Sequence, residues 1–185
     1  MNSLRQFLKC AVASVLLLTG GAAFGVDAER LDGLFADLGV ADQRDAQRIE
    51  QDIWLELSRS GSDAMDLLLE RGRAAMEAGD TQTAIGHLTA LVDHAPEFAE
   101  GYNARATAYY SAGLYGASMS DIAQVLAREP RHFGALSGMA LILETTGAPE
   151  RALEVLQHIK EIYPLMEGLS LRIERLEKAT EGTSL

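Results

Sequence analysis

The chain of 185 residues is long enough for one ordinary domain with short appendages. Its composition, 48% hydrophobic and 23% charged, argues against wholesale disorder. The formal net charge at pH 7 is −11, and an acidic surface repels nucleic acid phosphates and anionic membranes at long range. We therefore expect no nucleic acid ligand, and a neutral or basic partner.

Residues 1–25 have the three parts of a secretory signal peptide. Two basic residues come first, then an apolar run over residues 11–18, then the small residues Ala23 and Gly25 before the expected cleavage point. The alternative is a retained membrane anchor, but a stable spanning helix needs roughly 20 predominantly apolar residues. We predict cleavage, a periplasmic or secreted protein, and no stable membrane insertion.

Cys10 is the only cysteine, and it precedes the apolar run, whereas a lipid-modified cysteine should follow such a run. Cleavage of the leader would leave no thiol in the mature chain. That excludes cysteine catalysis, thiolate metal sites and disulfides. The leader favours the bacterial periplasm.

Residues 26–62 are predicted to form two helices. From Ala28 to Leu38 apolar residues recur at i, i+3, i+4 and i+7, the spacing of one helix face, and Gly39 follows as a stop. A second helix is predicted from about residue 42 to residue 58. Its apolar face includes Trp54, the only tryptophan.

The next hundred residues repeat with a period of 34. One position is always glycine and another always proline: Gly79, Gly113 and Gly147, and Pro96, Pro130 and Pro164. Two further positions hold small residues: Gly72, Ala106 and Ala140, and Ala84, Ser118 and Ala152. Aliphatic positions between them keep the same period, as Leu88, Ile122 and Leu156 do. Each unit reads as two helices with a glycine turn between them and a closing proline.

Three copies of this pattern resemble the tetratricopeptide repeat (TPR) family. The resemblance implies an all-α fold, a right-handed superhelical α-solenoid of helical hairpins, with full repeats at 63–98, 99–132 and 133–164. Counting back 34 residues from Leu88 reaches Trp54. Residues 26–62 are therefore interpreted as a degenerate hairpin that caps the array, with Trp54 packed against the first full repeat.

After the third repeat, Leu165, Leu169, Ile173 and Leu176 form one face of a final helix whose other face is charged. Residues 165–179 are predicted to be a capping helix that faces solvent. Residues 180–185 are predicted to be a frayed tail.

No catalytic or metal-binding pattern is found. The four histidines lie outside any HExxH pattern, and the chain has no G-x-S-x-G and no phosphate-binding glycine loop. Surface or packing roles are expected for the histidines, with His94 and His132 at helix joints. We predict a protein that is not an enzyme and has no cofactor and no metal.

In TPR proteins the first helix of each repeat usually lines a concave groove that binds peptides. Carried over by helical position, this implies the groove residues Asp66, Leu69, Glu70, Arg73, Met76, Asn103, Thr107, Tyr110, Ser111, Ser137, Leu141, Glu144 and Thr145. The candidates singled out are Arg73, Met76, Asn103, Thr107, Tyr110, Leu141 and Glu144. Asn103 matches a position where asparagine often contacts peptide backbone, and Tyr110 is a residue type enriched in binding hot spots.

The basic clamp that chaperone-binding TPR proteins use for acidic peptide tails is not reproduced. Leu69, Gly134 and Gly138 stand where that clamp would have polar or basic groups, which argues against a cytosolic co-chaperone. The resemblance implies an adaptor or scaffold that binds a protein or peptide. The alternative is a structural subunit of an envelope or secretion assembly, or a self-associating protein, which should expose a contiguous apolar patch.

Overall fold

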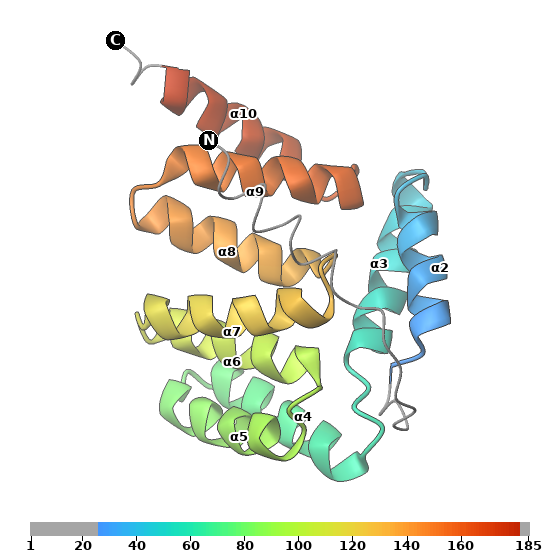
Figure 1. Ribbon diagram of the computed structural model, residues 1–185, viewed down its shortest axis with the longest axis vertical. Helices are drawn as coiled ribbons and strands as arrows, with labels where there is room; N and C mark the ends of the chain where they lie inside the picture. Colours follow the sequence, from blue (N-terminus) through green and yellow to red (C-terminus); the bar gives the residue numbers. More distant parts are fainter. Residues whose placement is uncertain (1–25, 182–185) are drawn as a thin grey trace.

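The computed structural model describes residues 26–181, which form α-helices and no strand (Figure 1). The predicted leader and residues 182–185 lie outside this part. Three hairpins make up most of it: α4 (Asp63–Glu77) with α5 (Thr81–His94), α6 (Ala99–Ser111) with α7 (Tyr115–Arg128), and α8 (Phe133–Thr145) with α9 (Pro149–Ile162). Figure 1 shows them stacked in chain order. The predicted all-α helical repeat architecture is confirmed.

A glycine with positive φ ends the first helix of each hairpin. The φ angles of Gly79, Gly113 and Gly147 are 76°, 74° and 78°, a region that residues with a Cβ adopt poorly. At the first turn the amide of Asp80 donates to the carbonyl of Ala75 at 2.9 Å, and the amide of Gly79 donates to the carbonyl of Met76 at 3.0 Å. This is a Schellman motif, and equivalent bonds close the other two turns.

Small residues let the two helices of a hairpin approach closely, as predicted. A Cβ built on Gly72 would lie 2.5 Å from the side chain of Leu88, so only glycine fits there without a shift. In the second hairpin the buried Ser118 hydroxyl donates to the carbonyl of Ala106 at 2.7 Å. Both small positions of the third hairpin are fully buried alanines.

The amino-terminal hairpin does not extend the stack at the first repeat. Figure 1 shows α2 (Ala28–Leu38) and α3 (Gln43–Leu57) standing along one side of the stack and crossing its layers. Their buried apolar residues share one core with α8, α9 and α10, whereas the core of the first repeat is separate. The prediction that this hairpin caps the first repeat is wrong, because its apolar face is buried mainly against the third repeat.

Trp54 shows why the hairpin lies there. Its ring meets those of His132 and Phe133 edge-on, with centroids 5.5 and 5.3 Å away, so its expected packing on the first repeat is wrong. The indole also covers Gly134, where an added Cβ would lie 2.4 Å from Trp54 Cη2. One repeat earlier this position is Glu100. The missing side chain in the third repeat therefore makes room for the tryptophan.

Two polar contacts support the same placement. Arg131 is 2.8 Å from Asp32 of α2, and its guanidinium lies over the ring of Phe35. The hydroxyl of Tyr163 donates to Glu50 of α3 at 3.1 Å. Burial, and the neighbouring Glu50 carboxylate, raise the pKa of Tyr163 to about 12.

The carboxyl-terminal helix differs from the prediction at both ends. Helix α10 (Leu169–Glu181) begins after Gly168, whose φ is 73°, so Leu165 precedes the helix and is exposed. Thr180 and Glu181 belong to the helix and not to a tail. Helix α10 packs on α9 through Leu169, Ile173 and Leu176, as the spacing predicts.

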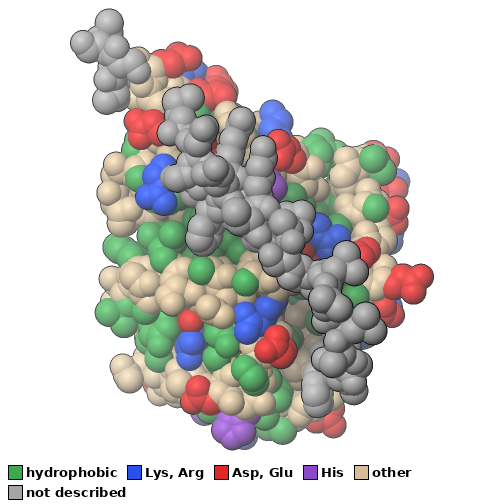
Figure 2. All heavy atoms as spheres, viewed as in Figure 1, with side chains coloured by type: hydrophobic (Ala, Val, Ile, Leu, Met, Phe, Trp, Pro, Cys, Tyr) green, Lys and Arg blue, Asp and Glu red, His purple; other side chains and the backbone are tan. Residues whose placement is uncertain are grey.

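The described residues visible in Figure 2 form a mixed surface, in which hydrophobic side chains are interspersed with acidic and basic ones.

Candidate functional site

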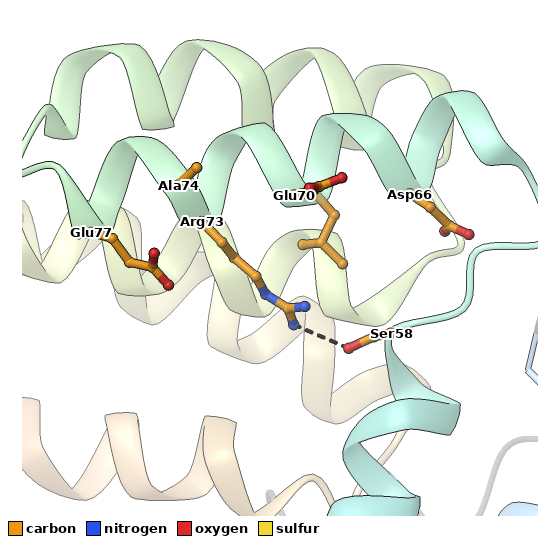
Figure 3. A pocket seen from close by; sticks show the side chains of 7 residues that line it. Ser58, Asp66, Glu70, Arg73, Ala74 and Glu77 are labelled. Carbon is orange, nitrogen blue, oxygen red and sulfur yellow. Dashed lines mark hydrogen bonds between the residues drawn. The ribbon is translucent and has the colours of Figure 1, made fainter.

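Three hollows follow one another along the first helices of the repeats. The acidic hollow, about 360 Å³, is lined by Ser58, Asp66, Leu69, Glu70, Arg73, Ala74 and Glu77 (Figure 3). The central hollow, about 310 Å³, is lined by Trp54, Arg73, Met76, Glu77, Leu88, Glu100, Asn103, Ala104 and Thr107. The apolar hollow, about 100 Å³, is lined by Asn103, Ala106, Thr107, Tyr110, Ser118, Ile122, Gly134, Ala135, Gly138 and Leu141.

The three hollows form one groove. Arg73 and Glu77 line both the acidic and the central hollow, and Asn103 and Thr107 line both the central and the apolar hollow. The groove runs from α4 across α6 to α8. Thr107 is exposed in it, and Asn103 is half-buried.

Six of the seven singled-out candidates line the groove: Arg73, Met76, Asn103, Thr107, Tyr110 and Leu141. Glu144 lines none of the three hollows, because its carboxylate accepts from Arg172 and Arg175 of α10, each at 2.7 Å. A ligand-binding role for the six stays a prediction. Of the wider set, Asp66, Leu69 and Glu70 line the acidic hollow, and Ser111, Ser137 and Thr145 line none of the three.

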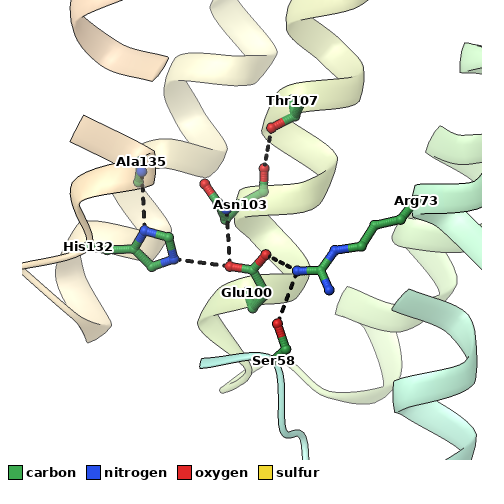
Figure 4. Close-up of polar contacts among 7 residues, drawn as sticks. All are labelled: Ser58, Arg73, Glu100, Asn103, Thr107, His132 and Ala135. Atoms are coloured by element: carbon green, nitrogen blue, oxygen red, sulfur yellow. Dashed lines mark hydrogen bonds and ion pairs between the residues drawn. The ribbon is translucent and has the colours of Figure 1, made fainter. Parts of the chain in front are cut away.

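A buried carboxylate forms the floor of the groove (Figure 4). Glu100 is 2% exposed, and its two oxygens accept from Arg73, from Asn103 Nδ2 at 3.0 Å and from His132 Nε2 at 3.0 Å. The Arg73 guanidinium also donates to the hydroxyl of Ser58 at 3.1 Å. A buried charge is stable only when it is paired and hydrogen-bonded, and here three donors meet that need.

His132 is held in one tautomer. It is the N-cap of α8, and its Nδ1 accepts from the amide of Ala135 at 3.2 Å. The ring proton is therefore on Nε2, which donates it to Glu100. The predicted role of His132 at a helix joint is confirmed, and the residue also joins α8 to the floor of the groove.

The same floor orients Asn103 toward a ligand. Its amide nitrogen points at Glu100, and its amide oxygen has no hydrogen-bond partner in the described part of the chain. A half-buried acceptor fixed in this way can accept from the backbone N–H of an extended peptide without first being reoriented.

The comparisons with known proteins agree with this geometry. The model of the family described as "Tetratricopeptide repeat" matches residues 69–124, which contain most of the groove. A TPR repeat-containing protein of Rhizobium etli is 41% identical over 155 residues, which are 83% of this chain and 76% of that protein. This chain belongs to the tetratricopeptide repeat family.

Solved TPR structures share the fold. The first TPR domain of Spaghetti (RPAP3), bound to the HSP90 peptide SRMEEVD, superposes with a TM-score of 0.61 at 20% identity, covering 65% of this chain and 98% of that one. The crystal structure of YrrB, a TPR protein with an unusual peptide-binding site, gives a TM-score of 0.55 at 19% identity, covering 80% and 76%. At these identities the likeness shows the fold alone.

Sequence reasoning missed part of this TPR groove. The sequence predicts only a packing role for Trp54, and it does not single out Glu77, Glu100 or Ser58 as groove residues. The sequence contains one weak indication of a special role for Glu100, because the equivalent residue one repeat earlier, Asp66, is also acidic. In the structure Asp66 is partly buried as well. The position of Ser58 depends on where the amino-terminal hairpin lies, which the repeat pattern does not give.

The described residues hold no group of three or more histidine, cysteine, aspartate or glutamate side chains arranged to bind a metal ion. None of the helices within residues 26–181 has the length and hydropathy of a membrane span.

Proposed function

We propose that this TPR protein is a non-catalytic periplasmic adaptor that binds an extended peptide or protein segment in the groove. The observation that carries the proposal is the continuity of the three hollows, since shared residues join them along α4, α6 and α8. Two proteins of similar fold support the proposal, because both bind peptides: the RPAP3 domain is bound to one, and YrrB has a peptide-binding site.

The periplasmic location rests on the predicted leader. Two basic residues, an apolar run and small residues before the cleavage point favour export and cleavage over anchoring. Secretion through the leader is equally compatible with an adaptor that works outside the cytoplasm.

The groove chemistry favours recognition of backbone together with a few side chains. Asn103 offers a fixed amide oxygen, and Tyr110 offers an aromatic side chain that is only half-buried. Aromatic side chains of this kind dominate many binding interfaces because they bury a large area with little loss of conformational entropy. A bound segment would cover both residues.

Site-specific photo-crosslinking in the bacterial envelope tests the proposal. A photoreactive amino acid replaces Thr107, which is exposed in the groove, in the full chain expressed with its own leader. The matched control places it at Gln82, an exposed residue of α5 that lines none of the three hollows.

We expect products from position 107 that map to one linear segment of another protein and decline when Tyr110→Ala is added. The same products from position 82, or products indifferent to Tyr110→Ala, would contradict groove binding.

A further inference from the structure

The two ends of the groove differ in charge, and this difference specifies the ligand further than the fold does. Three carboxylates, those of Asp66, Glu70 and Glu77, line the acidic hollow on one face of α4 (Figure 3). Arg73 is the one basic residue that lines any of the three hollows in the described part of the chain.

The charge of Arg73 is already compensated. Its guanidinium contacts the buried carboxylate of Glu100, so the two cancel within the floor of the groove. The acidic hollow therefore keeps the charge of its own three carboxylates.

Those carboxylates are open to a ligand. Glu70 and Glu77 are exposed, and neither carboxylate has a hydrogen bond or ion pair with another described residue. They lie seven residues apart, two helical turns, and so point from the same face of α4. Asp66 uses Oδ1 to accept from the amide and hydroxyl of Ser60, which leaves its second oxygen available.

The other end of the groove has no charge. The residues that line the apolar hollow include no Asp, Glu, Lys or Arg, and Tyr110, Ile122 and Leu141 supply its larger apolar surfaces. Burying a charged side chain there would cost its solvation with no partner to offset the loss. An apolar side chain fits this end.

We infer that the groove selects a peptide segment with Lys or Arg at the end that lies along α4 and an apolar side chain at the end that lies between α6 and α8. This inference rests on the proposed function and names the ligand class of the same groove. Packed helices lie roughly 8–10 Å apart. The distance from α4 across α6 to α8 is two such spacings, which an extended peptide of about five or six residues would span. The net charge of −11 steers such a ligand toward the protein.

Acidic segments are disfavoured by the same carboxylates. The peptide SRMEEVD, which the RPAP3 domain binds, carries three acidic residues and one basic residue. In the acidic hollow they would meet Glu70 and Glu77 with no free cation to pair with them. The two proteins share a fold and, on this inference, differ in the charge of their ligands.

Selection from a random heptapeptide library tests the charge preference. The full chain, expressed with its own leader, is compared with Glu70→Gln/Glu77→Gln and with Glu29→Gln/Glu177→Gln, which removes the same charge from exposed residues outside the groove. The groove variant Asn103→Ala/Tyr110→Ala gives the background of each selection.

We expect the wild type and the charge-matched control to enrich peptides with Lys or Arg at one end and apolar residues at the other. Binding of a selected peptide to Glu70→Gln/Glu77→Gln should be about two- to thirtyfold weaker, as two exposed ion pairs of roughly 0.2–1 kcal/mol each imply. SRMEEVD should not bind.

Peptides recovered with no basic bias, or a bias unchanged by Glu70→Gln/Glu77→Gln, would overturn the charge preference and leave the adaptor function standing. Recovery of no peptide above the Asn103→Ala/Tyr110→Ala background would overturn both.

Discussion

At the scale of single residues, Glu100 organises the floor of the groove. Each of its neighbours, Arg73, Asn103 and His132, is a hydrogen-bond donor, and each comes from a different part of the array: α4, α6 itself and the N-cap of α8. A carboxylate suits three donors because it only accepts. The orientation of Asn103 therefore depends on the carboxylate of a residue that is itself almost fully buried.

Glu100→Gln keeps the shape of the side chain but replaces one acceptor oxygen with a donor. In either orientation the new amide faces a donor, and Arg73 loses its charged partner, so we expect a loss of about 2 kcal/mol or more in the free energy of unfolding. Denaturant titration measures it. The control is Glu70→Gln, an exposed residue without a partner in the described structure, which should change stability by less than about 0.5 kcal/mol. Similar losses in the free energy of unfolding for the two variants would contradict a stabilising role of Glu100 in the floor of the groove.

Tyr163 gives the fold a dependence on alkaline pH. Its pKa in the folded protein is about 12, above an ordinary value near 10, because burial and Glu50 disfavour the phenolate. The folded state therefore holds the proton more tightly, and the stability due to this group is complete below about pH 10 and is lost as the pH rises toward 12.

Comparing the wild type with Tyr163→Phe isolates that effect. The stability difference between them should be constant up to about pH 10 and should then move against the wild type by on the order of 2 kcal/mol toward pH 12. Denaturant titrations across this range measure the difference. A difference that does not change with pH would contradict the raised pKa.

At the scale of helices, local signals account for what could be predicted. Each 34-residue unit contains its own stop, a glycine with positive φ such as Gly79, and its own closing proline, so the sequence predicts the hairpins. The placement of α2 and α3 rests instead on contacts such as Trp54 with Phe133, far apart in the chain. Nor does the repeat reveal that Glu144 pairs with α10. Helical position alone predicts nine of the groove residues, which is fewer than half of those that line the three hollows.

Gly134→Ala tests the placement of the amino-terminal hairpin. The new methyl group would overlap the indole of Trp54, so we expect a loss of about 1–3 kcal/mol in the free energy of unfolding and a red shift of tryptophan fluorescence. The control is Gly86→Ala in α5, where a Cβ has nothing within 4 Å and where alanine should stabilise the helix by about 0.5–1 kcal/mol. A stabilising effect of both substitutions would place Trp54 elsewhere.

At the scale of the whole molecule, the array and the hairpin together build the groove. Helices α4, α6 and α8 supply its length, while α3 reaches from the third repeat back to Arg73 through Ser58 and adds Trp54 to the central hollow. The hairpin thus joins the first and third repeats across one side of the groove. The resulting surface is acidic at one end and uncharged at the other, which the net charge alone could not have shown.

The central claim is that this groove is the binding surface. Fluorescence anisotropy with a labelled peptide from the library selection measures its dissociation constant for the wild type, for Asn103→Ala/Tyr110→Ala, and for Gln82→Ala/Gln157→Ala on exposed positions of α5 and α9. We predict binding that is about tenfold or more weaker in the groove variant, as loss of a hot-spot side chain implies, and unchanged in the control. Equal dissociation constants for all three proteins would contradict the claim.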